Sequence, residues 1–263
     1  MQPENPVTRP GAMYRLGSHL LLCGDATNRQ AVWRLMRAAG NGDEKTALLL
    51  TDPPYGVNYT GAAGSLANDN LDERSFMRLL ADSFAAACLV MRPGAAFYVW
   101  YASSQVFSVI AAMRSVQWTP RETLVWTKPT FVLGRQDYHW RHEACLYGWL
   151  PGATHTWAAD RRQSTVLDFV KPVSSPDHPT MKPVALFAYL VGNSTHPGDI
   201  VLDIFAGSGT TALACERLGR RARLVEIEPR YCDVIRRRWA ETVHGEGCDW
   251  VSLTPEVLPN DNT

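Results

Sequence analysis

The stretch DIVLDIFAGSGTTA, residues 199–212, holds the most informative change of pattern in the chain. Its first half is mostly apolar, as in a buried strand, and its second half carries small residues and two threonines that suit the start of a helix. Gly207 and Gly209 give the intervening turn a permissive backbone that can approach a ligand, and the start of the helix offers free N–H groups. This order predicts an α/β fold with a small-molecule site at the carboxyl end of its strands.

Similar alternations of short apolar runs and helical periodicity extend in both directions from this stretch. Strands are expected at residues 19–23, 46–51, 95–101, 122–126, 143–147, 199–204 and 223–227. Helices are expected at residues 28–39, 73–90, 103–114, 183–191, 210–218 and 229–239. The alternation predicts a mostly parallel sheet with helices on both faces. Segments 56–70, 131–141 and 151–178 lack periodicity and are expected to be long loops, which are usually functional in a compact α/β domain.

Composition limits the class of protein. A chain of 263 residues with 46% apolar content is long enough for one domain, expected at residues 14–254, with a flexible lead-in at 1–13 and a flexible tail at 255–263. The formal net charge is zero, so any contact with nucleic acid must be local. The six cysteines form no C-x-x-C pair, which argues against a disulfide framework or a zinc site and favours a cytoplasmic protein with reduced thiols and no metal. No run approaches the roughly 18 apolar residues of a membrane span.

The tetrapeptide Asp52-Pro53-Pro54-Tyr55 follows an apolar run, where a buried strand would emerge at its carboxyl end. Its prolines fix φ and remove two N–H donors, so the turn offers carbonyl groups to a ligand. An aryl amine whose two hydrogens are accepted by Asp52 and the Pro53 carbonyl has its nitrogen lone pair freed for an electrophile. Tyr55 offers a face on which an unstacked base can lie, worth roughly 1 to 3 kcal/mol. The alternative is a rigid turn with a surface tyrosine; the full tetrapeptide after a strand favours the functional interpretation.

The glycine turn and the strand after it suit a nucleoside. Glu226 lies 17 residues after Gly209 at the end of the next expected strand, close to the spacing of about 20 at which an acid meets ribose hydroxyls. Phe205 places an aromatic ring where it could face a cationic ligand such as a sulfonium. G-x-G alone would fit NAD equally well, but Ala212 stands where the dinucleotide fingerprint has its third glycine, and the P-loop lysine is missing.

Two further pieces fit the same pocket. Thr180 and Lys182 precede a helix that begins at Pro183 and would suit a carboxylate. Gly24-Asp25 ends the first strand, where an acid could accept from an adenine amino group. Each piece alone is equally consistent with a turn or helix-start residue. The predicted cofactor-binding set is Asp25, Ala26, Asp52, Thr180, Lys182, Asp203, Phe205, Gly207, Gly209, Thr210 and Glu226.

With these motifs in this order, from about residue 14 to 240, the chain resembles DNA amino-methyltransferases of the circularly permuted β type, in which D-P-P-Y precedes F-x-G-x-G. The resemblance implies a Rossmann-like fold that binds S-adenosylmethionine, with Glu226 on the ribose and Asp25 near the adenine. It also implies that Phe205, Gly207 and Gly209 surround the sulfonium and methionine part. Thr180 and Lys182 would then help hold the methionine carboxylate or amine.

The resemblance further implies the reaction. The enzyme would flip a base out of duplex DNA and transfer a methyl group to its exocyclic amino group by in-line displacement. Aspartate at position 52 is the usual residue of enzymes that act on adenine N6, whereas serine is commoner in cytosine enzymes. The stretch 133–140, with Tyr147-Gly148-Trp149, resembles methylases often fused behind a ParB-like domain, or carried by phages and prophages. A restriction–modification setting is also expected.

Contacts with DNA are expected in the region of about residues 130–178, which has little room for a large recognition domain. Specificity would then come from loops or from a second subunit, and a homodimer could read a palindromic site symmetrically. The candidate DNA-binding residues are Arg135, His139, Arg141, Arg161, Arg162 and Lys171, interleaved with Tyr138, Trp140 and Trp157. The alternative is that these are solvated charges and core aromatics.

Four other functions compete. Cytosine N4 methylation and amino-methylation of RNA or of a protein glutamine use similar N/D-P-P-Y turns, although most RNA and protein enzymes place the cofactor loop first. A catalytically silent DNA-binding module would have no need for intact Asp52, Tyr55, Gly207 and Glu226. An NAD-dependent dehydrogenase is disfavoured by the missing third glycine and by the tetrapeptide.

Overall fold

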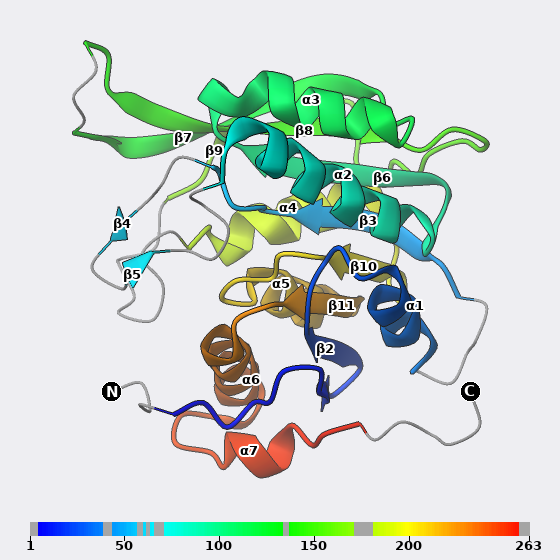
Figure 1. The fold of residues 1–263 in the computed structure, drawn as a ribbon, viewed down its shortest axis with the longest axis vertical. Helices are drawn as coiled ribbons and strands as arrows, with labels where there is room; N and C mark the ends of the chain where they lie inside the picture. The colour runs from blue at the N-terminus through cyan, green and yellow to red at the C-terminus, as the bar shows by residue number, and fades with distance from the viewer. Residues whose placement is uncertain are drawn as a thin grey trace.

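The computed structural model describes residues 5–38, 44–56, 60–61, 64–65, 71–133, 137–170 and 181–257. Within these ranges one nine-stranded sheet has the order β1-β2-β11-β10-β3-β6-β8-β7-β9 (Figure 1). Its strands are β1 (Met13–Leu16), β2 (His19–Cys23), β3 (Thr46–Thr51), β6 (Met91–Tyr101), β7 (Pro120–Val132), β8 (Trp140–Trp149), β9 (Val166–Asp168), β10 (Ile200–Asp203) and β11 (Arg221–Glu226). The short strands β4 (Thr60–Gly61) and β5 (Gly64–Ser65) pair with each other separately.

The centre of the sheet is parallel and its flanks are partly antiparallel. Strands β2, β11, β10, β3 and β6 run parallel, β1 and β8 pair antiparallel at either side of them, and β7 pairs antiparallel with β8 and parallel with β9. Every residue of β2, β3 and β10 is buried, as expected of parallel strands covered on both faces. The predicted α/β class with a mostly parallel sheet is therefore confirmed.

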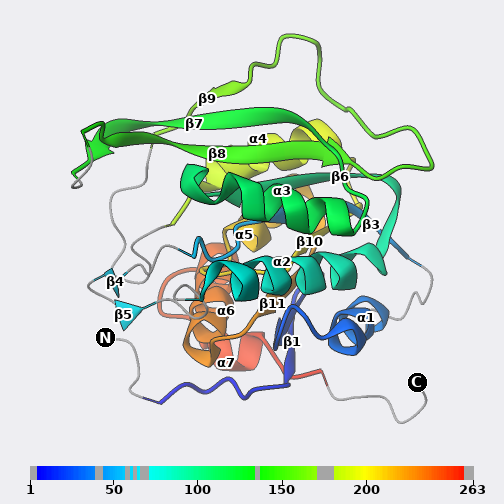
Figure 2. The same ribbon diagram turned by 45° about the horizontal axis from the view of Figure 1, so that its top comes forward.

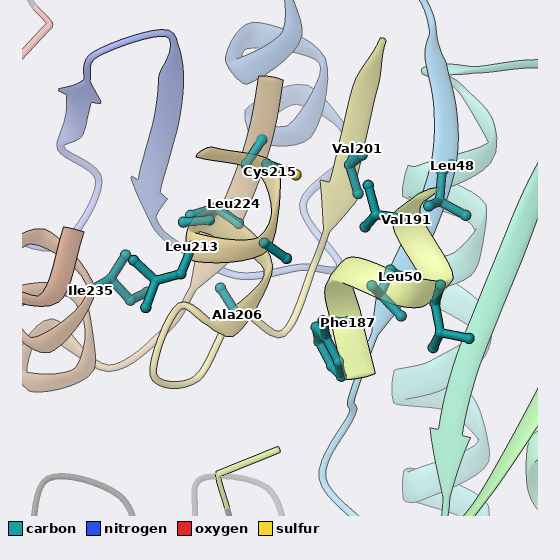
Figure 3. Packing of buried hydrophobic residues seen from close by; sticks show 14 of the residues in the cluster. Leu48, Leu50, Phe187, Val191, Val201, Ala206, Leu213, Cys215, Leu224 and Ile235 are labelled. Carbon is teal, nitrogen blue, oxygen red and sulfur yellow. The ribbon is translucent and has the colours of Figure 1, made fainter. Parts of the chain in front are cut away.

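Helices cover both faces of the sheet. Helices α1 (Arg29–Arg37), α2 (Glu73–Cys88) and α3 (Val106–Ser115) cover one face, and α4 (Val184–Ser194), α5 (Thr210–Leu218) and α6 (Pro229–His244) cover the other. Side chains of β3 alternate between the two layers: Leu49 packs with the first group of helices, and Leu48 and Leu50 pack with the second. Figure 3 shows Leu48 and Leu50 beside Phe187 and Val191 of α4. The sheet is thus fixed from both sides. A short 3-10 helix, η1 (Ser103–Gln105), precedes α3, and α7 (Trp250–Leu253) follows α6.

The β7–β8 hairpin is longer than predicted. Segment 131–141 was expected to be a loop, but β7 runs to Val132 and β8 begins at Trp140. Cross-strand pairing overrides the turn signals here, and the register shift between Thr127 and Val132 accommodates Pro129. Since Tyr101, the last residue of β6, pairs with Ala144, the start of β8 extends past the carboxyl end of β6. Figure 2 shows β7 and β8 projecting beyond the sheet on the side where β4 and β5 lie.

Both ends of the described chain lie against the domain. The backbone N–H groups of Val7 and Thr8 donate to the two carboxylate oxygens of Asp233 on α6, at 2.8 and 3.0 Å. At the other end, the N–H of Val257 donates to the carbonyl of Met13 at 2.7 Å. Parts of the predicted flexible lead-in and tail are therefore hydrogen-bonded to α6 and β1, in contacts between distant residues that local composition does not show.

The cysteines, the helices and the possible metal ligands of the described residues also bear on the expectations from the sequence. All six cysteines are free thiols, buried or partly buried. None of the helices in the described ranges is long and apolar enough to cross a membrane. In the same part of the chain, no three histidine, cysteine, aspartate or glutamate side chains are grouped in a way that could hold a metal ion.

Candidate active site

The carboxyl ends of four neighbouring strands bring the predicted motifs to one edge of the sheet. In the order β2, β11, β10, β3, these ends are followed by Asp25, by Glu226 itself, by the glycine turn and by the tetrapeptide at residues 52–55. The N–H of Gly24 donates to the carbonyl of Glu226 at 2.8 Å, which joins the first two. Motifs as far apart in the sequence as Asp25 and Glu226 thus share the edge at which open α/β sheets bind ligands.

Asp52 contacts Lys182 at the centre of this edge. The Lys182 ammonium forms an ion pair with Oδ2 of Asp52 and donates to the hydroxyl of Tyr55 at 3.0 Å. The Lys182 side chain is only 3% exposed, so its positive charge acts mainly on these neighbours. Oδ1 of Asp52 is also buried, and no hydrogen-bond donor reaches it from the described residues. One carboxylate oxygen is therefore neutralised while the other remains an open acceptor.

Sequence reasoning missed Glu143 and Lys128, which complete the cluster. Oε1 of Glu143 accepts from the Lys128 ammonium at 2.6 Å, and Oε2 accepts from the Lys182 ammonium at 3.0 Å and from the Tyr55 hydroxyl at 2.9 Å. Lys128 is on β7 and Glu143 on β8; Glu143 was predicted only as the first residue of a strand, and Lys128 fell just after a predicted strand with no role assigned. Glu143 and Tyr55 are 88 positions apart, so only the folded hairpin brings them together.

The cluster holds two opposed charge pairs in a mostly buried setting. Burial alone would raise the pKa of Glu143, but the ammonium groups of Lys182 and Lys128 lower it to about 2. Burial would lower the pKa of Lys182, but Asp52 and Glu143 raise it above its usual value. For Asp52, burial raises the pKa against the attraction of Lys182. The Tyr55 pKa is raised by burial and by the two carboxylates, so its hydroxyl remains a donor.

The glycine turn before α5 is fixed by backbone conformation and packing. Gly207 and Gly209 have φ values of 53° and 80°, in the left-handed region that favours glycine. A Cβ atom on Gly209 would lie 2.9 Å from Cγ2 of Ile235 on α6. The structure thus explains Gly209 by its φ and by helix packing, without the ligand approach that the sequence suggested.

Glu226 is the acceptor that organises the glycine turn. Its Oε2 accepts from the N–H of Gly207 at 2.7 Å, and its Oε1 accepts from the N–H of Glu228 at 2.9 Å. Burial raises the pKa of this carboxyl to about 7. Since each carboxylate oxygen has more than one lone pair, both can accept a further hydrogen bond. Glu226 can therefore hold the turn and a ligand hydroxyl together.

Asp203 joins the same turn to β3. Its carboxylate accepts from the hydroxyls of Thr51, at 2.9 Å, and of Thr211, and from the N–H of Phe205 at 3.2 Å. Burial raises its pKa to about 6. These contacts account for the residue through protein structure alone, and its predicted contact with a cofactor stays a prediction.

The other predicted cofactor residues lie around the same edge. Asp25 is exposed, and its Oδ1 accepts from the N–H of Thr27 at 2.8 Å, as in a tight turn. Ala26 beside it is buried, and Phe205 is partly buried against the apolar layer of α1, α2 and α3. The Thr210 hydroxyl donates to the carbonyl of Lys182 at 3.5 Å. Thr180 lies outside the described residues.

The predicted DNA-binding residues fall into two described groups. On the hairpin, the ring of His139 stacks on Phe131 with centroids 5.1 Å apart, and Nε of Arg141 donates to the carbonyl of Lys128 at 3.1 Å. In the segment before β9, Arg161 is exposed and Arg162 forms an exposed ion pair with Asp160. Arg135 and Lys171 lie outside the described residues.

Comparison with known proteins places the chain among methylases. A family model described as DNA methylase matches residues 149–237. The methylase YubD of Escherichia coli (strain K12) is 32% identical over 184 residues, which cover 70% of this chain and 77% of that protein. The type II methyltransferase M.HpaI of Haemophilus parainfluenzae is 24% identical over 251 residues, covering 86% of this chain and 78% of that protein.

Solved structures share the fold at lower identity. M1.HpyAVI in complex with SAM has a TM-score of 0.63 at 21% identity, covering 83% of this chain and 97% of that chain. The cytosine-N4-specific PvuII DNA methyltransferase has a TM-score of 0.62 at 17% identity, covering 95% of this chain and 93% of that chain. The sheet, its helices and the edge described above therefore belong to a fold that DNA methyltransferases use.

Proposed function

Since this chain belongs to the family of DNA methylases that modify adenine N6 or cytosine N4, we propose that it methylates the N6 amino group of adenine in DNA at a specific site. S-adenosylmethionine is its methyl donor. The observation that carries the proposal is Oδ1 of Asp52, a buried acceptor with no hydrogen-bond partner among the described residues, in the tetrapeptide that also contains the Pro53 carbonyl and the Tyr55 ring. An amino group can donate one hydrogen to this acceptor and its other hydrogen to a second acceptor.

The residues at the glycine turn fit S-adenosylmethionine. The Glu226 carboxylate is buried, accepts from the N–H groups of Gly207 and Glu228, and retains lone pairs for hydroxyl donors such as those of a ribose. Asp25 is exposed at the neighbouring strand end and is a second acceptor. Phe205 offers an aromatic ring to a cation. We expect Glu226 to hold the ribose of the cofactor and Asp25 to hold its adenine. Phe205 and the glycine turn are expected to surround the sulfonium and methionine part.

The side chains around Asp52 then prepare the target base for reaction. S-adenosylmethionine, when bound, supplies an electrophilic methyl group on a sulfonium. Asp52 Oδ1 and the Pro53 carbonyl accept the two amino hydrogens, which withdraws the nitrogen lone pair from the ring and makes it nucleophilic. Because Lys182 is paired with Oδ2, we assign the contact with the base to Oδ1, which has no hydrogen-bond partner among the described residues. As the nitrogen–methyl bond forms, the nitrogen releases a proton, and Asp52, with its pKa raised by burial, can accept it before it passes to water.

Tyr55 supports a flipped base in this proposal. Its ring would stack on the adenine and offset part of the few kcal/mol that unstacking costs. The hydroxyl of Tyr55 is held by Glu143 and Lys182, which fixes the ring before the base arrives. A face prepared in advance loses less conformational freedom on binding.

The β7–β8 hairpin and the segment before β9 are the proposed DNA contacts. Tyr138 and Leu133 near the hairpin end are 91% and 80% exposed, and His139 and Arg141 lie beside them in sequence. A protein of zero net charge needs such a local surface for DNA. We also propose the permuted β type, a bacterial or phage origin with a cytoplasmic location, and a restriction–modification setting. A homodimer would double this small recognition surface on a palindromic site.

The first experiment measures transfer of labelled methyl from S-adenosylmethionine to unmethylated bacterial DNA, with the nucleosides then separated. The wild type is expected to label N6-methyladenine, and Asp52→Ala to reduce the rate by about a thousandfold or more because the acceptor is lost. Label on N4-methylcytosine would reject adenine while retaining the reaction. No label on any DNA, despite cofactor binding, would reject DNA as the acceptor.

A further inference from the structure

Glu143 contacts the tetrapeptide, although the strand that carries Glu143 is not paired with the strand that precedes the tetrapeptide. It lies on β8, and β6 stands between β8 and β3 in the sheet. The hairpin carries it past the carboxyl end of β6, where its carboxylate accepts from Tyr55 at 2.9 Å and from Lys182 at 3.0 Å. The contact therefore depends on the hairpin projecting beyond the sheet.

This carboxylate is unusually well supported for a side chain that is only 18% exposed. Lys128, on the other strand of the hairpin, binds its second oxygen at 2.6 Å. Two ammonium groups thus compensate its desolvation and keep it ionised at neutral pH. An ionised Glu143 is a strong, permanent acceptor for the Tyr55 hydroxyl.

We propose that Glu143 is a positioning residue for methyl transfer, which holds Tyr55 and Lys182 in the arrangement that leaves Asp52 Oδ1 open to the target amine. This inference rests on the function proposed above. The Lys182 ammonium lies 5.4 Å from the centroid of the Tyr55 ring and 5.0 Å from that of Trp100, so two aromatic rings as well as two carboxylates surround it.

Charge balance gives the reason that the arrangement needs Glu143. With Glu143, two ammonium groups, Lys128 and Lys182, face two carboxylates, Glu143 and Asp52. Without it, Asp52 is the remaining carboxylate of the cluster for both ammonium groups. Lys182 is then expected to shift toward Asp52 and compete with the amine for Oδ1, and the Tyr55 hydroxyl loses its acceptor.

The kinetic consequence is specific. Glu143 contacts Tyr55, Lys182 and Lys128 and not the Glu226 side of the edge, so its loss should change the reaction step and DNA binding more than cofactor binding. Glu143→Gln keeps the shape and one acceptor but removes the charge. We expect kcat to fall about tenfold to a hundredfold, as for a charged hydrogen bond, while KM for S-adenosylmethionine changes less than about twofold.

The matched control is Glu122→Gln, the same substitution at an exposed position near the start of β7, away from the hairpin end that is proposed to contact DNA. It is expected to retain wild-type kinetics. Glu143→Asp keeps the charge on a shorter side chain and is expected to recover part of the activity that Glu143→Gln loses. Circular dichroism at the assay temperature confirms that each variant is folded.

A double-mutant cycle with Tyr55→Phe tests whether Glu143 acts through Tyr55. If it does, Glu143→Gln lowers kcat less in the Tyr55→Phe background than in the wild type. Equal losses in both backgrounds would overturn the Tyr55 part of the inference. A Glu143→Gln variant with kcat within about twofold of the wild type would overturn it entirely.

A measurement without catalysis separates this inference from the proposed function. 3-Fluorotyrosine placed at position 55 reports its own ionisation by ¹⁹F NMR, and Glu143→Gln is expected to lower the pKa of this phenol because a neighbouring negative charge and acceptor are lost. An unchanged titration would overturn the contact whatever the activity. If Glu143→Gln shifts the titration but the wild-type protein methylates no DNA, the contact between Glu143 and Tyr55 is supported and the proposed function is overturned.

Discussion

The two halves of the candidate site are held together by different means. The half around Glu226 and the glycine turn depends on backbone donors: the N–H groups of Gly207, Phe205 and Glu228 bind carboxylates 19 residues away or fewer. The half around Asp52 depends on side-chain ion pairs between segments up to 130 residues apart. The first half is a property of a local strand–turn–helix unit, whereas the second exists only after the sheet and the hairpin have formed.

The difference also sets how each half responds to pH. Within the described part of the chain no ammonium or guanidinium group forms an ion pair with Asp203 or Glu226, and burial raises the pKa of Asp203 to about 6 and of Glu226 to about 7. In the other half, Lys182 and Lys128 hold the pKa of Glu143 at about 2. Near neutral pH, the turn should therefore titrate while the ionic cluster keeps its charges.

The largest expected effect comes from removing the cation that joins the ionic half. Lys182→Met leaves Asp52 and Glu143 buried beside each other with one ammonium group, and we expect the free energy of unfolding to fall by about 3 to 5 kcal/mol. Methyl transfer should fall about a thousandfold. Urea denaturation and initial rates measure the two, with Lys45→Met as an exposed control.

The same variant offers a sharper test of the ion-pair explanation. In Lys182→Met two carboxylates share the one remaining ammonium group, that of Lys128. Adding Glu143→Gln removes the excess negative charge, so part of the lost stability should return, without recovery of activity. A double variant less stable than Lys182→Met would contradict the view that charge pairing, and not packing, holds this half together.

The next effect tests the turn half through packing. Gly209→Ala places a Cβ atom 2.9 Å from Ile235 at a φ of 80°, and we expect a loss of about 2 to 4 kcal/mol in stability with weaker binding of S-adenosylmethionine. Gly219→Ala is the matched control, because Gly219 has a φ of 66° but open space where its Cβ would lie. It should lose only about 1 to 2 kcal/mol. Equal losses, measured by urea denaturation, would show that backbone conformation alone requires glycine at 209.

The contrast between the halves also explains what sequence could predict. The strands at 19–23 and 46–51 and the helix at 210–218 have the predicted bounds, because apolar runs and glycine turns are local signals. The tetrapeptide and the turn could be assigned to one edge because parallel strands end together. Glu143 and Lys128 could not be assigned to this edge from the sequence, since their position depends on the length of the hairpin and on a register shift that no local pattern specifies. Lys182 was predicted to help hold the methionine carboxylate or amine of the cofactor; the structure pairs it with Asp52 and Glu143, and its contact with the cofactor stays a prediction.

A smaller effect is expected from pH. The pKa of Glu226 is raised from 4.5 to about 7 by burial, so between these values the folded chain holds a proton that the unfolded chain has released, and stability falls as pH rises. Glu226→Gln should flatten this dependence of stability on pH, and Asp203 should retain part of it.

The same ionisation should change cofactor binding. An ionised Glu226 is the better acceptor for a ribose hydroxyl, so wild-type affinity for S-adenosylmethionine should rise about tenfold between pH 6 and 8. Calorimetric titration that gives equal affinities at both values would contradict this role.

The smallest effect concerns the hydrogen bond that joins the halves. Thr51, at the end of the strand before Asp52, donates to Oδ1 of Asp203 beside the glycine turn at 2.9 Å. Thr51→Val removes the hydroxyl at constant shape and should cost about 1 kcal/mol of stability, since Asp203 keeps its contacts with Thr211 and Phe205. Thr51→Ser keeps the donor and should retain most of the stability that Thr51→Val loses. If the halves are as independent as their chemistry indicates, Thr51→Val leaves the kcat loss caused by Glu143→Gln unchanged. A coupling of more than about 0.5 kcal/mol between them would mean that the two halves work as one unit.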